Sequence, residues 1–133
     1  MTAACDSSVL IPALNPRHPD HATVRDLRSQ VTAVPAHVLL ETYSALTRMP
    51  LPFRMPGAAV ARALDGLGLD IVGLPESGQA ALVSTCAAAG VDGGAVYDGL
   101  VGLTALHHDL TLLTRDRRAR ATYDALGVRY TLV

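Results

Sequence analysis

The sequence contains no lysine and no tryptophan, and it has a single phenylalanine among its 133 residues. The absence of lysine excludes a P-loop nucleotide-binding site and a receiver-type phosphoacceptor domain, because both depend on that side chain. The shortage of aromatic rings argues against a module that binds nucleic acid mainly by stacking its bases. The apolar residues are mainly Ala, Val and Leu, a composition that favours thin helices packed on an aliphatic sheet.

Long hydrophobic runs are also missing, since no stretch approaches the roughly 18 consecutive apolar residues of a membrane span. The start, MTAACDSSVL, lacks the cationic segment and the apolar run of a signal peptide. Cys5 and Cys86 lie far apart in apolar segments, which indicates buried free thiols in a reducing compartment. We therefore expect a soluble, cytoplasmic protein that makes no contact with a membrane.

The length and charge of the chain predict one folded domain, residues 1–133, with an ordinary buried core. Half of the residues are hydrophobic and only 17% are charged, a composition that excludes disorder. The formal net charge of -1 provides no overall attraction to a polyanion. Any binding of nucleic acid must therefore come from a local cluster of charges.

Short apolar runs alternate with longer segments that carry helical signals. We expect strands at residues 3–5, 31–34, 69–72, 110–113 and 128–132, and helices within residues 18–30, 36–49, 56–68, 75–90, 93–109 and 115–127. In the segment 36–49, Leu39, Tyr43 and Leu46 have the spacing of a buried helical stripe. The proline-rich stretch PLPFRMP, residues 50–56, indicates a turn between helices. Such alternation predicts parallel strands in a layered α/β fold.

Four carboxylates occupy positions that this fold would bring together. Asp6 follows an expected strand directly and Asp116 lies shortly after another, and the C-terminal ends of parallel strands are where such sheets bind ligands. Glu41 lies early in one expected helix and Asp98 near the start of another. Each acid could instead be a solvated surface residue or a partner of a helix N-terminus. Their joint placement favours a shared site.

The segments CDSSVL, HVLLETYSALTR, GGAVYDGLVGLTAL and LLTRD, in this order, resemble the PIN-domain nucleases, and more narrowly the VapC toxins of bacterial toxin–antitoxin pairs. The resemblance spans nearly the whole chain. It implies a three-layer α/β/α sandwich with a central, mostly parallel sheet. It also implies that Asp6, Glu41, Asp98 and Asp116 form the catalytic, metal-binding pocket, with Ser7 and Thr114 as supporting residues.

The activity implied by the resemblance is that of an endoribonuclease dependent on Mg²⁺, with Mn²⁺ able to substitute. Hard cations prefer carboxylate oxygens, keep several water ligands, and can activate water for attack on phosphorus. One departure from the family pattern is glycine at positions 99 and 102, where relatives often carry alanine. We expect these glycines to loosen the helix that holds Asp98.

Arginines 115, 117, 118 and 120 cluster beside Asp116. Guanidinium groups pair well with phosphate oxygens, so we predict that Arg115, Arg117 and Arg118 contact the phosphates of an RNA substrate. Part of this cluster could instead be a solvated helix start. The family further implies a homodimer and a small antitoxin whose C-terminal segment covers the acidic cleft.

Three other interpretations remain open. His18 and His21, or His37 with Glu41, have spacings found in zinc sites, although a third ligand has no obvious source. A catalytically silent α/β module that binds RNA or protein would keep the fold without turnover. A phosphatase with an N-terminal Asp nucleophile would need a second acid where Ser8 stands, and a lysine.

Overall fold

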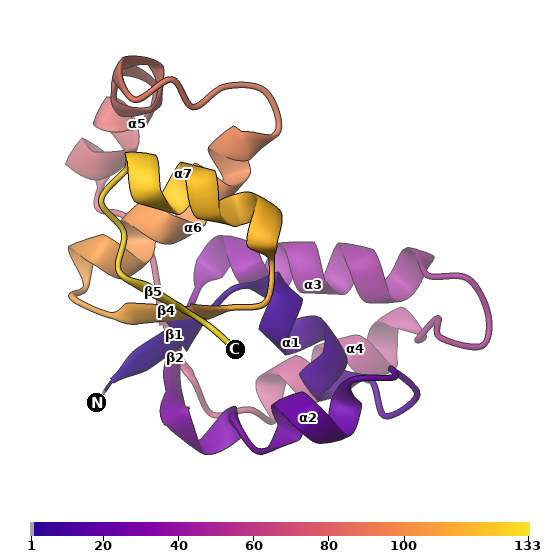
Figure 1. Ribbon diagram of the computed structural model, residues 1–133. Helices are drawn as coiled ribbons and strands as arrows, with labels where there is room; N and C mark the ends of the chain where they lie inside the picture. Colours follow the sequence, from indigo (N-terminus) through magenta and orange to yellow (C-terminus); the bar gives the residue numbers. More distant parts are fainter. Residues whose placement is uncertain (1) are drawn as a thin grey trace.

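A computed structural model describes residues 2–133. Five strands form one parallel sheet in the order β3-β2-β1-β4-β5 (Figure 1). Their bounds are Ala3–Cys5 (β1), Val31–Pro35 (β2), Asp70–Val72 (β3), Thr111–Thr114 (β4) and Tyr130–Leu132 (β5). Each lies where the sequence predicted a strand, with ends that differ by up to two residues. The predicted parallel sheet is confirmed.

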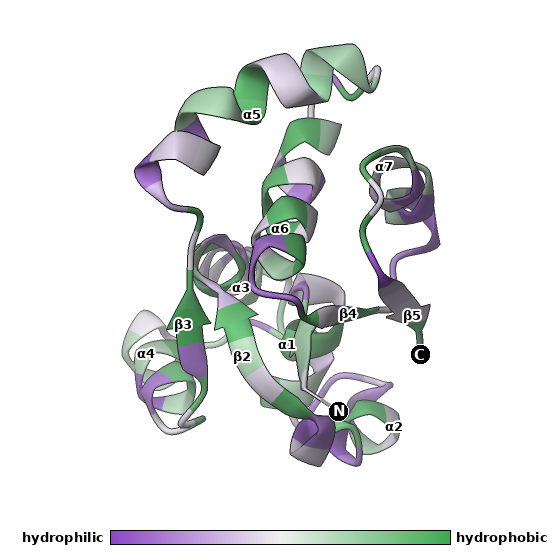
Figure 2. Cartoon of the chain, turned by 90° about the vertical axis from the view of Figure 1, so that its left-hand side faces the viewer, coloured by the Kyte–Doolittle hydropathy of each residue, from purple (hydrophilic) through white to green (hydrophobic). Residues whose placement is uncertain are grey.

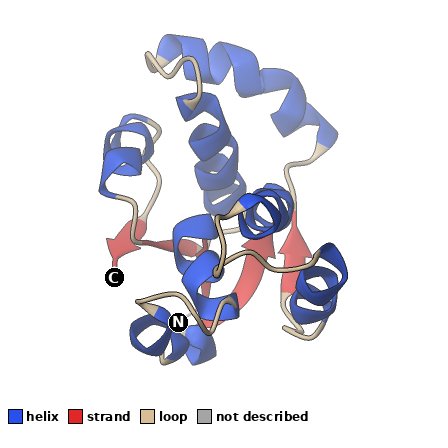
Figure 3. Ribbon diagram, turned by 90° about the vertical axis from the view of Figure 1, so that its right-hand side faces the viewer, coloured by secondary structure: helices blue, strands red, loops and turns tan. Residues whose placement is uncertain are grey.

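Helices lie on both sides of this sheet, with α6 and α7 above it and α2 and α4 below it in the view of Figure 1. Figure 3 shows the same layers from the right-hand side. The helices are α1 (Ser7–Leu14), α2 (His21–Arg25), α3 (Ala36–Arg48), α4 (Gly57–Asp65), α5 (Glu76–Ala88), α6 (Ala95–His107) and α7 (Arg120–Ala125), with short 3₁₀ turns η1 (Arg28–Gln30) and η2 (Arg117–Ala119). This arrangement confirms the three-layer α/β/α prediction.

Helix α1 is the one helix within residues 2–133 that the sequence pattern did not predict. Pro12 lies inside it. Because a proline beyond the first turn removes a helical hydrogen bond, the sequence pattern did not favour a helix here. The helix forms because Asp6 caps it, accepting a hydrogen bond from the backbone N–H of Ser8. It also buries Val9 and Leu10 in the core.

The order of the strands determines where a ligand site of this sheet lies. From β1 the chain moves to β2 and β3 on one side and then returns to β4 on the other side of β1. The direction of winding therefore reverses between β1 and β4, and ligands of such sheets bind beyond the C-terminal ends of the two strands at this point. Asp6 follows β1, and Thr114 is the last residue of β4.

Helix α6 packs against the sheet and against α7, and Figure 2 shows hydrophobic residues along most of its length. A Cβ at Gly102 would stand 2.8 Å from Cγ2 of Val128 and 3.0 Å from Cδ1 of Tyr123. At Gly99 it would stand 3.3 Å from Sγ of Cys86. The expectation that these glycines loosen α6 is wrong, because they let the helix pack closely on its neighbours.

The buried face of α3 also differs from the prediction. It consists of Val38, Thr42 and Leu46, whereas Tyr43 is 41% exposed. The prediction is confirmed for Leu46, whereas Val38 and Thr42 are buried next to the predicted Leu39 and Tyr43. Apolar side chains lie on several sides of this helix, so spacing alone does not select the buried face. Both cysteines are buried free thiols, as predicted. Across residues 2–133, no helix is both long and apolar enough to cross a membrane.

Candidate active site

Asp6 lies at the centre of the site and is only 5% exposed. Its Oδ1 accepts hydrogen bonds from the backbone N–H of Ser8 at 3.1 Å and from the Ser8 hydroxyl at 2.5 Å. Its Oδ2 accepts from the hydroxyls of Thr114 at 2.5 Å and Tyr123 at 2.9 Å. Burial raises the pKa of this carboxyl, and these hydrogen bonds act in the opposite direction. The four donors hold Asp6 in one orientation.

Two hydroxyls connect Asp6 to the end of β4. The Thr114 hydroxyl, which donates to Asp6, accepts a hydrogen bond from the backbone N–H of Asp116 at 3.1 Å. The Ser8 hydroxyl accepts one from the backbone N–H of Arg115 at 2.7 Å. The chain that carries Asp116 is thus tied to the same network as Asp6.

Asp116 also caps η2, where its Oδ1 accepts from the backbone N–H of Arg118 at 2.9 Å. Asp6 has the same capping role for α1. The alternative interpretation, that these acids serve helix starts, is therefore true of both residues. For Asp116 this does not exclude a chemical role, because its carboxylate accepts this one hydrogen bond and keeps other lone pairs available.

Glu41 and Asp98 approach the site from α3 and α6. Burial raises the pKa of Glu41 to about 7, with further contributions from the negative charges of Asp98 and Asp6. Burial also raises the pKa of Asp98, together with the charges of Asp116 and Asp6. Like charges close to one another favour protonation. The tertiary structure therefore brings Asp6, Glu41 and Asp98 within electrostatic reach of one another, and Asp116 within reach of Asp98.

The ligand geometry is more open than a preformed metal cage. Among the His, Cys, Asp and Glu side chains of residues 2–133, no three converge closely enough to hold a metal ion by themselves. The chemistry of the donors nevertheless fits a hard cation, because the acids and the hydroxyls beside them offer only oxygen. The assignment of all four acids as metal ligands stays a prediction.

The arginines beside the site divide into two groups. The Nη1 atom of Arg115 lies 3.1 Å from Oδ2 of Asp20, and the side chain is 24% exposed. That ion pair joins Arg115 to the residue that precedes α2, and its predicted contact with RNA stays a prediction. Arg118, in contrast, is 96% exposed, with its Nε 3.9 Å from Asp116, and its charge lowers the pKa of Asp98. Arg117 is also exposed.

The histidines do not form a cluster in the described part of the chain. Ring nitrogens of His18, His21 and His108 are hydrogen-bonded to backbone groups. His37 stacks on Tyr97, with ring centroids 5.5 Å apart and an interplanar angle of 10°. These positions give the zinc interpretation no support.

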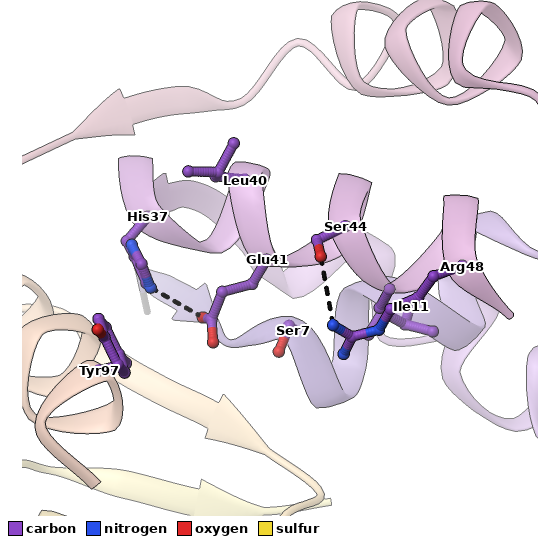
Figure 4. A pocket seen from close by; sticks show the side chains of 9 residues that line it. Ser7, Ile11, His37, Leu40, Glu41, Ser44, Arg48 and Tyr97 are labelled. Carbon is purple, nitrogen blue, oxygen red and sulfur yellow. Dashed lines mark hydrogen bonds and ion pairs between the residues drawn. The ribbon is translucent and has the colours of Figure 1, made fainter. Parts of the chain in front are cut away.

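A cleft of about 420 Å³ opens beside Glu41 (Figure 4). It is lined by Ser7, Ile11, His37, Leu40, Glu41, Ser44, Ala45, Arg48 and Tyr97. Ser7, predicted as a supporting residue, contributes to this wall of the cleft, and the hydrogen-bond partner of Asp6 is its neighbour Ser8. Of the four acids, Glu41 lines the cleft, which gives a ligand access to that carboxyl.

Sequence reasoning did not identify Ser8 and Tyr123 as parts of the site. Ser8 had a local signal, because an aspartate before a helix commonly accepts from the N–H two residues later. Tyr123 had none: it lies 117 residues from Asp6 in the chain, and only the packing of α7 brings its hydroxyl to that carboxylate.

Comparison with known proteins gives the same assignment as the geometry. The model of the PIN domain family matches residues 3–125. The protein called Ribonuclease VapC40 of Mycobacterium tuberculosis is 42% identical over 132 residues, covering 98% of each chain. Ribonuclease VapC27 of the same organism is 40% identical over 126 residues, covering 94% of this chain and 92% of the relative.

Solved structures share the fold at lower sequence identity. VapBC2 from Rickettsia felis, bound to a DNA fragment from its promoter, has a TM-score of 0.69 at 16% identity and covers 100% of this chain and 99% of its own. PAE2754 from Pyrobaculum aerophilum has a TM-score of 0.62 at 19% identity, with coverage of 98% and 92%. The chain therefore belongs to the PIN-domain family and, within it, to the VapC-type proteins.

Proposed function

We propose that this protein is a Mg²⁺-dependent endoribonuclease that acts as the toxin of a toxin–antitoxin pair. The observation that carries the proposal is the gathering of Asp6, Glu41 and Asp98 at the edge of the sheet, where their charges act on one another and Asp116 acts on Asp98. Membership of the PIN-domain family and two relatives named as ribonucleases support the same conclusion.

The donor set favours Mg²⁺, with Mn²⁺ as a substitute. Mg²⁺ usually binds proteins through one or two carboxylates and keeps several waters, so it does not require three converging protein ligands. When bound, such a cation activates water as a nucleophile and offsets negative charge at the phosphate. Asp6, Glu41, Asp98 and Asp116 are the residues that would hold it.

The protein's own side chains then have separate tasks. Ser8, Thr114 and Tyr123 fix the orientation of Asp6 through hydrogen bonds. Glu41, with a pKa of about 7, can give up or take a proton at its carboxyl near neutral pH, as a group in acid–base chemistry must. Arg118 is exposed beside Asp116 and can bind a phosphate of the RNA.

The partner proposed for this protein is an antitoxin whose C-terminal segment lies across the acidic cleft, and the proposed assembly is a homodimer. Support comes from the VapC-type assignment and from the fold shared with VapBC2 of Rickettsia felis. An inhibitory segment of this kind would need to enter the cleft that Glu41 lines in order to reach this carboxyl.

The test is to incubate the purified protein with total cellular RNA in EDTA, in Mg²⁺ and in Mn²⁺, and to map the new RNA ends. We expect cleavage with either metal, none in EDTA, and none for Asp98→Asn in any buffer. Asp70→Asn is the matched control, because Asp70 is exposed at the N-terminal end of β3, at the opposite edge of the sheet.

Each departure from this pattern has a defined meaning. Cleavage by Asp98→Asn at the wild-type rate would refute the proposed site. If the wild-type protein binds RNA but leaves it intact in both metals, the protein is the catalytically silent binding module. Cleavage that requires Zn²⁺ and is lost in His37→Ala would favour the histidine alternative.

A further inference from the structure

Two aromatic rings stack on each other beside Glu41 and Asp98. His37 of α3 and Tyr97 of α6 stack with ring centroids 5.5 Å apart and planes 10° from parallel. The His37 Nε2 atom lies 4.0 Å from Oε1 of Glu41, and Tyr97 directly precedes Asp98. Because the rings come from two helices that contact each other, their positions are set by the fold.

Tyr97 is 55% exposed although it lies against His37. Of the other tyrosines, Tyr123 is buried and donates to Asp6, and Tyr130 donates to Asp124. The ring of Tyr97 lines the cleft, and a ligand that stacked on it would remove apolar surface from water.

The cleft extends from these rings along one face of α3. His37, Glu41, Ser44 and Arg48 are spaced four, three and four residues apart, which places them on the same side of the helix. Figure 4 shows Glu41 and Ser7 facing the same space and the guanidinium of Arg48 near the Ser44 hydroxyl, where Nη1 donates at 3.4 Å. From His37 to Arg48 the helix rises roughly 16 Å.

The order of these groups matches a single strand of RNA. An aromatic surface suits a nucleobase, the acids adjoin it, and a guanidinium further along suits a second phosphate. An apolar peptide segment could contact Ile11 and Leu40 in the same cleft. Such a segment does not alternate aromatic rings with phosphates, as a strand of RNA does. The chemistry of the cleft therefore favours RNA.

We infer that a nucleobase flanking the scissile phosphate stacks on the exposed face of Tyr97, that His37 supports the ring from behind, and that Arg48 binds a neighbouring phosphate of the same strand. This inference rests on the proposed ribonuclease activity and names how its substrate is held. Stacking tolerates any base, because every base has a π-face. The site positions the strand without reading a fixed sequence.

The experiment measures the affinity of wild type and variants for a short single-stranded RNA that contains a mapped cleavage site, by fluorescence anisotropy in EDTA. Tyr97→Ala should weaken binding by about 5- to 150-fold, the range for loss of one stacked base. Tyr97→Phe, which keeps the ring, should recover most of that loss. Tyr43→Ala is the matched control, since Tyr43 is a partly exposed tyrosine of α3 outside the cleft lining.

A second measurement separates stacking from a structural effect of Tyr97→Ala. In a series of RNAs, each with one abasic nucleotide, a single position next to the cleavage site should weaken wild-type binding. At that position, wild type and Tyr97→Ala should bind equally. Circular dichroism melting of each variant checks that the fold is intact.

The possible failures are distinguishable. If wild type neither binds nor cuts RNA, the proposed function and this inference fail together. If wild type cuts RNA but Tyr97→Ala binds it with unchanged affinity, the stacking inference alone is overturned, and the cleft is left to a protein segment. A loss of affinity that persists at every abasic position would also overturn it, because the ring would then act without contacting a base.

Discussion

Replacing Glu41 with glutamine should make the metal-free protein more stable at pH 8. Burial and the charges of Asp98 and Asp6 raise the pKa of Glu41 from 4.5 to about 7, so its ionised form is disfavoured in the folded state. At about 1.4 kcal/mol per pKa unit, this cost is roughly 3 kcal/mol before screening. Because the side chain keeps 31% of its surface in water, we reduce the expected gain to about 1–2 kcal/mol.

The pH dependence of this gain has a definite sign. Between pH 4.5 and 7 the folded protein keeps a proton on Glu41 that the unfolded chain releases. The stability contributed by that proton is complete below the unfolded pKa and is lost as the pH rises through the folded pKa. Glu41→Gln and wild type should therefore have nearly equal stability at pH 4.5 and differ most at pH 8.

Thermal melting in EDTA at the two pH values measures the difference, which should be roughly 4 to 8 °C in Tm at pH 8. Millimolar Mg²⁺ should raise the Tm of wild type more than that of Glu41→Gln, because a cation that binds only the folded state stabilises it. Glu76→Gln is the matched control: Glu76 lies exposed in the first turn of α5, where loss of its charge costs up to about 1 kcal/mol.

Two outcomes would refute this reasoning. A lower Tm for Glu41→Gln than for wild type at pH 8 would show that the carboxylate is not repelled by its neighbours. An equal gain at pH 4.5 and pH 8 would show that the effect comes from packing and not from charge.

Two further predictions concern the residues around the acids. Tyr123→Phe removes the hydroxyl that donates to Oδ2 of buried Asp6. This change should lower the free energy of unfolding by about 1–3 kcal/mol and slow RNA cleavage. A urea unfolding curve with no loss of stability would contradict this prediction. Replacing both Arg117 and Arg118 with alanine should make the logarithm of RNA affinity depend less steeply on the logarithm of salt concentration. The slope should fall by up to about 1.4, since each phosphate contact contributes about 0.7 on single strands. An unchanged slope would mean that the RNA binds on another face.

Much of the scaffold was predictable because its signals are local. The strands β1, β2 and β4 are short apolar runs; Asp6 directly follows β1, and Asp116 lies two residues after β4. Parallel strands end at one edge of a sheet, so the meeting of these two acids could be inferred from their positions in the chain. The buried faces were less predictable, as α3 shows, because Leu39, Leu40 and Tyr43 offer apolar side chains on several sides.

The sequence by itself determined which chemistry is possible: no lysine, few aromatic rings, and four acids placed at strand ends and helix starts. The tertiary structure decided how these groups are held. Tyr123 reaches Asp6 only because α7 packs on α6, whose Gly102 leaves room for the Tyr123 ring. Likewise, Tyr97 and His37 stack because α6 lies against α3. Contacts between residues so far apart depend on packing and leave no periodic trace in the chain.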